Sequence, residues 1–100
     1  MNEFNVLGVL DSIGPLEETS TGIKVVNFVI RAERPFKSSQ SQDEFKITAF
    51  KELAESVATS YTIGSTVLIS GRLQSNNYRK DDKVYYSTEM LAEKIFCVQR

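Results

Sequence analysis

The sequence predicts an all-β domain with one short helix, in which five strands curve into a small barrel. Apolar and polar residues alternate along three of the stretches that we assign to strands, which is the period of a half-buried sheet. One stretch between the third and fourth strands changes to a period of about four, which is typical of an amphipathic helix. The chain has 100 residues, so we predict a single domain over residues 1–100.

The first two strands are predicted over residues 4–13 and 23–34, with a loop over 14–22 between them. The first strand is rich in β-branched and apolar residues and contains Gly8, which indicates a bulge or a bend. In the second strand, one face is expected to carry Phe28, Ile30 and Ala32, and the other Asn27, Val29, Arg31 and Glu33. Pro35 then ends regular pairing.

The middle of the chain is predicted to be a polar loop over residues 37–44, a third strand over 45–50 and a helix over 51–61. The helix is expected to have a narrow apolar stripe made of Leu53, Ala54, Val57, Ala58 and Tyr61.

A fourth strand is predicted over residues 66–78 and a fifth over 84–98, joined by a turn at the aspartate pair 81–82. Five curved strands with a single helix between the third and the fourth form the OB-fold, a five-stranded Greek-key barrel. We therefore predict an OB-fold, with Gly8 and Gly71 as the bend points that allow the barrel to close.

The composition excludes several classes of protein. The chain has 12 Lys and Arg against 13 Asp and Glu, so its formal net charge is −1. Any positive surface must come from local clustering, which argues against nucleic-acid binding by charge alone. The N-terminus has neither a basic segment nor a long apolar run, and no stretch approaches the ~20 apolar residues of a membrane span. We therefore expect no signal peptide and no membrane contact.

Enzymatic activity is not expected, because the chain has no histidine and one cysteine. Cys97 lies among apolar residues and is expected to be a structural thiol in the core. A single cysteine cannot form an internal disulfide, which fits the reducing cytoplasm. The paired acids at 17–18, 43–44 and 81–82 are expected to be solubilising turn residues. No cluster is typical of a zinc site and no glycine-rich phosphate loop is present, so no metal or cofactor is expected.

A candidate ligand face follows the predicted fourth strand. One parity, expected to face the barrel interior, contains Val67, Ile69, Gly71 and Leu73. The other parity, expected to form an outward strip about 20 Å long at ~3.3 Å per residue, contains Arg72, Gln74, Asn76 and Tyr78. In the third strand Phe45, Ile47 and Ala49 are expected to point inward, and Lys46, Thr48 and Phe50 outward. The alternative is a solvated surface with a tyrosine at its rim.

The second strand and the segment after it add Arg31, Arg34, Phe36 and Lys37, so three strands each place an aromatic residue close to cations. This arrangement suits single-stranded nucleic acid, because any base can stack on an aromatic ring, which contributes ~1–3 kcal/mol per base. In a duplex the bases are already stacked, so single strands should be preferred. The predicted nucleic-acid-binding residues are Arg31, Arg34, Phe36, Lys37, Lys46, Thr48, Phe50, Arg72, Gln74, Asn76, Tyr78 and Lys80.

Four blocks of the sequence resemble, in order, those of the bacterial single-stranded DNA-binding protein family. They are "NFVIRAERPF" (27–36), "AFKELAESVA" (49–58), "GSTVLISGRLQSNNY" (64–78) and "STEMLAEKI" (87–95). The resemblance implies an OB-fold, usually a homotetramer, around which single-stranded DNA is wrapped during replication, recombination or repair. It implies that Phe36, Phe50 and Tyr78 are the stacking aromatics and that the protein is cytoplasmic and associated with the nucleoid.

The chain departs from the family pattern at three places. Glu44 stands where relatives usually carry another outward aromatic residue, and Phe45 is expected to point inward unless a bulge turns it toward the ligand. Gln74 and Asn76 are neutral where relatives are often basic, so weaker binding than in a typical member is expected. The family's disordered linker and acidic tip do not follow "FCVQR", so recruitment of repair proteins through a tail is not expected, unless the tail was removed.

The alternative function is an adaptor that acts mainly through protein contacts, as in primosomal replication protein B, which is similar in fold. An adaptor should not lose function when Phe50 or Tyr78 is replaced, whereas a stacking DNA binder should. In either case we expect a homo-oligomer, a tetramer rather than a dimer by the resemblance. Its contacts are expected from the first strand and from four residues of the fifth, Tyr85 or Tyr86 with Met90 or Leu91.

Overall fold

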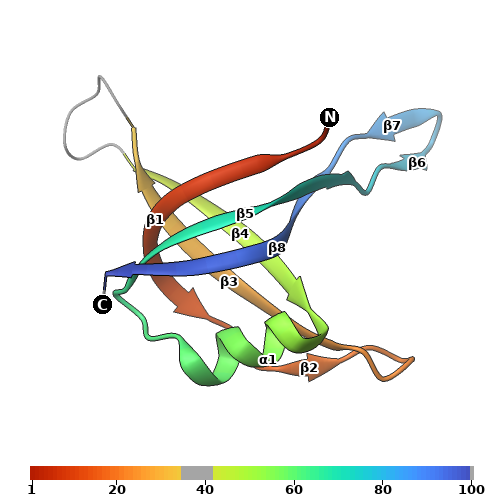
Figure 1. Cartoon of the computed structure of the whole chain (residues 1–100). Helices are drawn as coiled ribbons and strands as arrows, with labels where there is room; N and C mark the ends of the chain where they lie inside the picture. The colour runs from red at the N-terminus through yellow and green to blue at the C-terminus, as the bar shows by residue number, and fades with distance from the viewer. Residues whose placement is uncertain (35–41, 100) are drawn as a thin grey trace.

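Five long strands form a barrel, and one helix lies across one end of it (Figure 1). The computed structural model describes residues 1–34 and 42–99. The long strands are β1 (Phe4–Ile13), β3 (Lys24–Glu33), β4 (Gln42–Phe50), β5 (Thr66–Ser75) and β8 (Thr88–Gln99). The shorter elements are β2 (Glu17–Glu18), α1 (Lys51–Ser60), β6 (Tyr78–Lys80) and β7 (Lys83–Tyr85).

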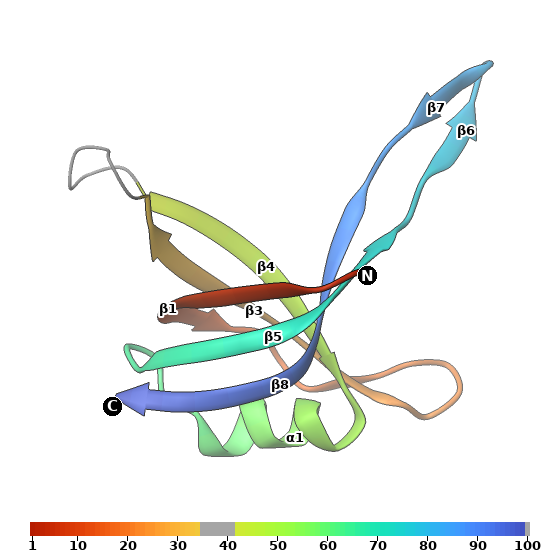
Figure 2. The same ribbon diagram turned by 45° about the horizontal axis from the view of Figure 1, so that its top comes forward.

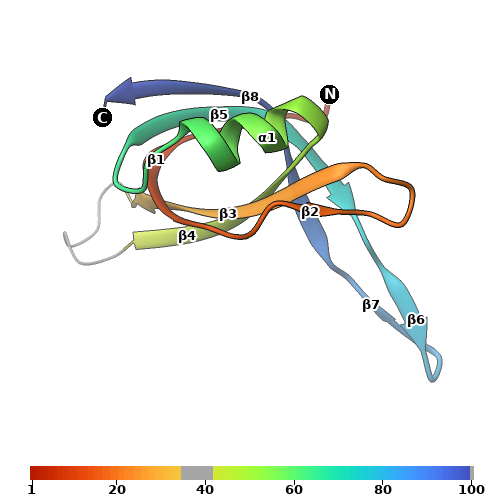
Figure 3. The same ribbon diagram turned by 90° about the horizontal axis from the view of Figure 1, so that it is seen from below.

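Strand pairing closes the barrel. The strands are neighbours in the order β1, β5, β8, β4, β3, and β3 pairs back with β1. The pair β4–β8 is parallel, and the other pairs of the barrel are antiparallel. With α1 between the third and fourth long strands, this topology is the OB-fold, which confirms the predicted fold class. Seen from below, α1 covers the opening of the ring of strands (Figure 3).

Two glycines lie where backbones approach closely enough to close the barrel. A Cβ on Gly8 would lie 2.6 Å from the carbonyl oxygen of Arg31, next to the point at which β1 changes its partner from β5 to β3. A Cβ on Gly71 would lie 1.9 Å from the carbonyl oxygen of Leu91, at a shift of register between β5 and β8. Only glycine fits such contacts, which agrees with the predicted role of both residues as bend points.

The core is filled by inward side chains of the strands and by one side of α1. Its buried members are Leu10, Val26, Phe28, Ile30, Ile47, Ala49, Ala54, Val57, Val67 and Ile69. Burying a side chain of the size of Phe28 or Ile30 contributes ~1.5–3 kcal/mol. Phe45 packs against this core, as its inward parity predicts, and so do Leu53 and Tyr61 of the helical stripe. The hydroxyl of Tyr61 donates to the carbonyl of Ile95 at 3.2 Å and so fastens the end of α1 to β8.

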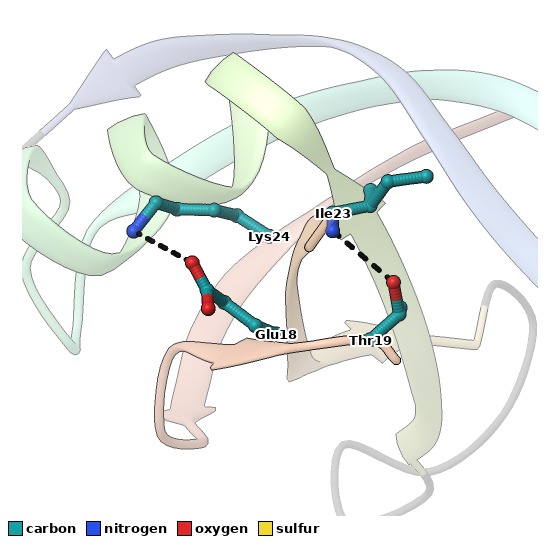
Figure 4. A network of polar contacts seen from close by, with 4 residues as sticks. All are labelled: Glu18, Thr19, Ile23 and Lys24. Atoms are coloured by element: carbon teal, nitrogen blue, oxygen red, sulfur yellow. Dashed lines mark hydrogen bonds and ion pairs between the residues drawn. The ribbon is translucent and has the colours of Figure 1, made fainter. Parts of the chain in front are cut away.

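The predicted loop over 14–22 contains the short strand β2, which pairs with the start of β3. Side chains hold this small sheet together (Figure 4): Lys24 Nζ lies 3.6 Å from Glu18 Oε1, and the amide of Ile23 donates to Thr19 Oγ1 at 3.1 Å. The acidic pair at 17–18 is therefore part of a strand rather than of a turn.

The fourth strand, predicted to run to residue 78, instead ends at Ser75, and the chain continues into a separate hairpin of β6 and β7. The break is stabilised by Asn77, whose Oδ1 accepts the amide hydrogen of Ser87 at 2.9 Å in place of a ladder carbonyl. The hairpin projects away from the barrel as an arm (Figure 2). The predicted fifth strand is interrupted in the same way and resumes at Thr88. Leu73, expected to face the interior, is exposed because β5 has run past the core there.

Cys97 is exposed, so its predicted place in the core is wrong. It lies near the end of β8, where the register with β5 shifts, beside a shallow cavity at the C-terminal end of α1. The alternation of apolar residues in this strand does not show that both of its sides are exposed to solvent at this end. Helix α1 itself is too short and too polar to cross a membrane, and it is the only helix in the described ranges.

Candidate nucleic-acid interface

A row of outward side chains crosses four strands of the barrel. Strand register aligns Asn27 of β3 with Thr48 of β4, Thr48 with Leu91 of β8, and Leu91 with Arg72 of β5. Directly paired residues share a face of the sheet, so these four side chains lie side by side. We call this row and Phe50 the barrel face. The row brings together Thr48 and Arg72, which the sequence predicts to be outward residues of two different strands.

Contacts within the row make it rigid. The Thr48 hydroxyl donates to Asn27 Oδ1 at 2.7 Å, so both side chains are held in one orientation. Leu91 has only 8% of its surface exposed, although it lies outside the core cluster. Arg72 is exposed, with its guanidinium free of any ion pair to the residues in 1–34 and 42–99. A fixed polar and apolar row ending in an available cation is suited to an extended ligand with a charged backbone.

A groove lies beside this row, between the first half of β4 and the start of β8. Its lining consists of Glu44, Phe45, Lys46, Thr48, Ser87, Thr88, Glu89 and Met90. Lys46 therefore lies close to Thr48 of the row, and Gln74 pairs with Glu89, which also lines the groove. Two carboxylates, Glu44 and Glu89, flank the single lysine. The groove is therefore not uniformly positive, and its charge limits how strongly it attracts phosphates.

Phe50 offers a partly exposed ring at the far end of β4. It has 39% of its surface exposed and lies in a cross-strand row with Val25 of β3 and Glu17 of β2. The next residue, Lys51, has φ 61°, a left-handed conformation that turns the chain sharply from β4 into α1. The predicted outward position of Phe50 is thus confirmed.

Two of the arginines that the sequence predicts to bind nucleic acid form ion pairs with carboxylates of this chain. The Arg31 guanidinium donates to Asp11 of β1 and forms an ion pair with it. Arg34 forms an ion pair with Asp43 at 2.7 Å, where β3 ends and β4 begins. Both must share or exchange these partners to contact a phosphate. Phe36 and Lys37 lie outside the described residues.

The remaining predicted residues leave the barrel. Asn76 lies in the break after β5, and Tyr78 and Lys80 lie on the arm, so the continuous outward strip predicted along the fourth strand is interrupted. On the arm the Tyr78 ring stacks on that of Tyr85, with 5.0 Å between ring centroids and 12° between planes. Sequence reasoning did not assign Tyr85 to the site. Counting outward from the two-residue turn at 81–82 would have paired it with Tyr78.

Three further residues of the site were missed: Asn27, Leu91 and Glu89. The sequence predicts Asn27 on the outward face of its strand, but only the pairing of β3 with β4 shows that Thr48 lies opposite it. Leu91 and Glu89 enter the face because β8 runs parallel to β4, and alternation along one strand does not show which strand lies beside it. Within the described ranges no three acidic or thiol side chains come together as a metal site would require.

This architecture defines a class: a small OB-fold barrel whose outer face combines exposed aromatic rings with cations. A profile of the single-strand binding protein family matches residues 1–98, so the chain belongs to that family. It is 33% identical to "Single-stranded DNA-binding protein 3" of Listeria innocua, over 95% of this chain and 62% of the relative. It is 32% identical to "Single-stranded DNA-binding protein 1" of Staphylococcus aureus, over 95% and 64%, and 33% identical to "Single-stranded DNA-binding protein" of Bacillus cereus, over 95% and 58%. The chain thus spans less than two thirds of the length of these relatives.

Proposed function

We propose that this protein binds single-stranded DNA, with little preference for sequence, on the barrel face. The observation that carries the proposal is the row Asn27–Thr48–Leu91–Arg72 with the exposed ring of Phe50 at the edge of the same face. In this role it would be a cytoplasmic, non-catalytic protein that protects single strands in replication, recombination or repair. The names of its relatives support the same ligand.

Stacking and side-chain contacts should dominate this binding rather than net charge. The chain has a formal net charge of −1, and Arg31 and Arg34 are already paired with carboxylates. Bases of a single strand can reach aromatic rings, whereas bases within a duplex are stacked on each other. The preference for single strands therefore follows from the available groups, and the salt dependence should be shallow because two of the predicted cations, Arg31 and Arg34, are already engaged by carboxylates.

The test is the affinity of barrel-face variants for a labelled oligo-thymidine, measured by fluorescence anisotropy. Phe50→Ala should weaken binding by about one stacking increment, roughly 5- to 150-fold. Arg72→Gln should reduce the slope of log affinity against log salt by about 0.7. Lys94→Gln is the matched control, because Lys94 is exposed and lies in a different row, with Ser70 and Asn5. Wild-type affinity in both barrel-face variants would contradict the proposal.

An adaptor that contacts only proteins is the alternative, and the comparisons do not favour it. The two functions are separated by the same titration, since an adaptor would show no saturable binding of oligo-thymidine at micromolar concentration. In that case the barrel face would be examined as a protein-docking surface.

We also propose that the protein self-associates through β1, as the sequence predicts, together with residues of β5 and β8 other than those expected. Of the predicted strand-five contacts, Met90 packs on the core, Leu91 is buried and Tyr85 stacks on Tyr78. An apolar row instead crosses β1, β5 and β8 at Leu7, Leu68 and Phe96, with Leu7 58% and Phe96 55% exposed. Contiguous exposed apolar side chains of this kind are typical of subunit contacts.

Sedimentation equilibrium tests the association. Wild type should be an oligomer, with a tetramer favoured over a dimer by the family, and Phe96→Glu should dissociate it because a carboxylate would be buried in an apolar contact. Tyr86→Glu, a charge of the same sign at an exposed residue away from the row, should leave the oligomer intact. A monomeric wild type at micromolar concentration would refute the association.

A further inference from the structure

A small cavity lies where the C-terminal end of α1 meets the end of β8, and Figure 2 shows these two ends side by side. Its volume is about 220 Å³. The lining consists of five side chains with a hydroxyl group and one with a thiol: Ser56, Ser60, Tyr61, Thr62, Ser65 and Cys97. Pockets that enclose a drug-sized ligand usually measure ~300–1,000 Å³, so this one suits only a small polar group. We call it the hydroxyl cavity.

Ser65 is the buried polar residue of this cavity. It has 4% of its surface exposed, and no other polar side chain in residues 1–34 and 42–99 is as deeply buried. Its backbone is fully paired, because its amide donates to the carbonyl of Thr62 at 3.1 Å and its carbonyl accepts from the amide of Leu10 at 2.9 Å. Its hydroxyl forms no hydrogen bond with the described part of the chain and opens on the cavity. Buried hydroxyls in folded proteins have partners, so this one indicates a ligand position.

Cys97 places a thiol at the rim of the same cavity, and the thiol is exposed. Neighbouring residues of a strand point to opposite sides, so Cys97 points away from the side of β8 that carries Phe96 and the proposed subunit contact. Leu91 of the barrel face is six residues earlier in β8, ~20 Å along the strand. The hydroxyl cavity is therefore separate from both of the surfaces proposed above.

The position of the cavity favours a cationic group. The last carbonyls of a helix lack intrahelical partners and carry partial negative charge. Helix α1 has no basic residue in its last turn, and none of the described lining side chains is charged. The hydroxyl oxygens of Ser60 and Ser65 can accept hydrogen bonds from an ammonium group. A small ammonium ion is thus stabilised here, whereas a carboxylate is repelled.

We propose that the hydroxyl cavity is a modification site, at which Cys97 forms a mixed disulfide with a small aminothiol whose ammonium group is held by Ser65 and the end of α1. The thiol of Cys97 loses its proton, and its sulfur attacks one sulfur of a small aminothiol disulfide. A new S–S bond forms, the old one breaks, and the other half leaves as a thiolate that takes up a proton. Excess free thiol reverses the exchange. The inference does not depend on the proposed function, because a protein that failed to bind DNA would leave it standing.

The experiment compares three small disulfides that differ in charge: cystamine, which is cationic, hydroxyethyl disulfide, which is neutral, and dithiodipropionate, which is anionic. The mass gain of the full chain over time gives the rate of each reaction. Each rate is divided by the rate for the same protein unfolded in urea, which removes the intrinsic reactivity of the reagent. The ratio should be about two- to fivefold higher for cystamine than for the neutral reagent, the effect of one charge at a helix end. The ratio for the anionic reagent should be lower than for the neutral one, and both differences should shrink at high salt.

Variants test the two parts of the site. Ser65→Ala should roughly halve the preference for cystamine, because one hydrogen bond to the ammonium group is lost, and it should leave the rate with the neutral reagent unchanged. Ser20→Ala, at an exposed turn residue outside the cavity, is the matched control and should keep the wild-type preference. The double variant Cys97→Ser, Ser75→Cys moves the thiol to the exposed end of β5, where the three ratios should be equal.

Equal ratios for the three reagents on the wild-type protein would overturn the inference. A cystamine preference of the same size in the protein with Ser75→Cys would also refute it, since the net charge of the chain would then explain the effect. Finally, a Ser65→Ala protein with the wild-type preference would show that the buried hydroxyl does not hold the ammonium group. Circular dichroism of each variant shows that the comparison is made on folded protein.

Discussion

Arg31 of β3 donates a hydrogen bond to the carboxylate of Asp11 of β1, and the two side chains form an ion pair with about one third of each exposed. The pair links the two strands at the bulge between Leu10 and Ser12, just after β1 begins to pair with β3 at Val9. It also neutralises a cation that the sequence assigns to DNA. The free protein is therefore less positive on this side than a count of arginines indicates.

Asp11→Asn should release Arg31 and strengthen binding to oligo-thymidine. The salt slope should become steeper by about 0.7, because one more cation can replace a counterion at a phosphate. The cost in the free energy of unfolding should be small, ~0–1 kcal/mol, as for other partly exposed ion pairs. Glu18→Gln, which removes the carboxylate paired with Lys24, is the control and should leave the slope unchanged. An unchanged slope in Asp11→Asn would show that Arg31 does not contact phosphate.

Glu44→Gln should also strengthen binding. Glu44 lines the groove that contains Lys46 and opposes a phosphate there, so removing its charge should raise affinity by about fivefold, ~1 kcal/mol, at low salt. Glu55→Gln, at an exposed residue of α1, controls for the change in net charge. Equal gains in both variants at low salt would mean that net charge, and not the groove, determines the effect.

Lys51→Gly should stabilise the fold. Lys51 has φ 61°, and a left-handed conformation costs a residue with a Cβ about 1–2 kcal/mol that glycine does not pay. Because glycine also gains entropy in the unfolded chain, we expect a net gain of ~1 kcal/mol in the free energy of unfolding, measured by urea denaturation at one protein concentration. Lys51→Ala removes the same charge but keeps the Cβ, so it should give no such gain. Equal stabilities of the glycine and alanine variants would contradict the assignment of strain.

Gly71→Ala should destabilise the barrel strongly. The new Cβ would lie 1.9 Å from the backbone carbonyl of Leu91, so β5 and β8 must separate at the bulge, at a cost of 1–3 kcal/mol or more, roughly that of overpacking. The measurement is thermal unfolding followed by circular dichroism, with Ser75→Ala at the exposed end of β5 as the control. A melting temperature equal to that of the control would show that the strands tolerate the contact.

Much of the fold can be predicted from the sequence because both strands and helix have a clear apolar period. Phe28 and Ile30, Ile47 and Ala49, and Val67 and Ile69 all point into the core as their alternation predicts. The alternation no longer predicts burial where a strand extends beyond the core. Beyond Arg72, β5 runs past the core, so Leu73 is exposed, and Tyr78 lies on the separate hairpin of β6 and β7.

The site is less accessible from the sequence because it depends on which strands are neighbours. Thr48 and Arg72 meet only through Leu91, and this requires the parallel pairing of β4 with β8. Likewise, Arg31 forms an ion pair because Asp11, twenty residues earlier in the chain, lies beside it in the folded barrel. Such contacts are properties of barrel closure, and no local pattern encodes them. The stacked pair of Tyr78 and Tyr85 is the exception, because the turn between them determines its register.

The most direct measurement is an anisotropy titration of labelled oligo-thymidine with the wild-type protein at two salt concentrations, beside a duplex of the same length. We expect saturable binding to the single strand, little or none to the duplex, and a shallow salt slope that counts the contacting cations at about 0.7 each. No binding at micromolar protein, or equal binding to single strand and duplex, would contradict the claim that this barrel holds single-stranded DNA by stacking.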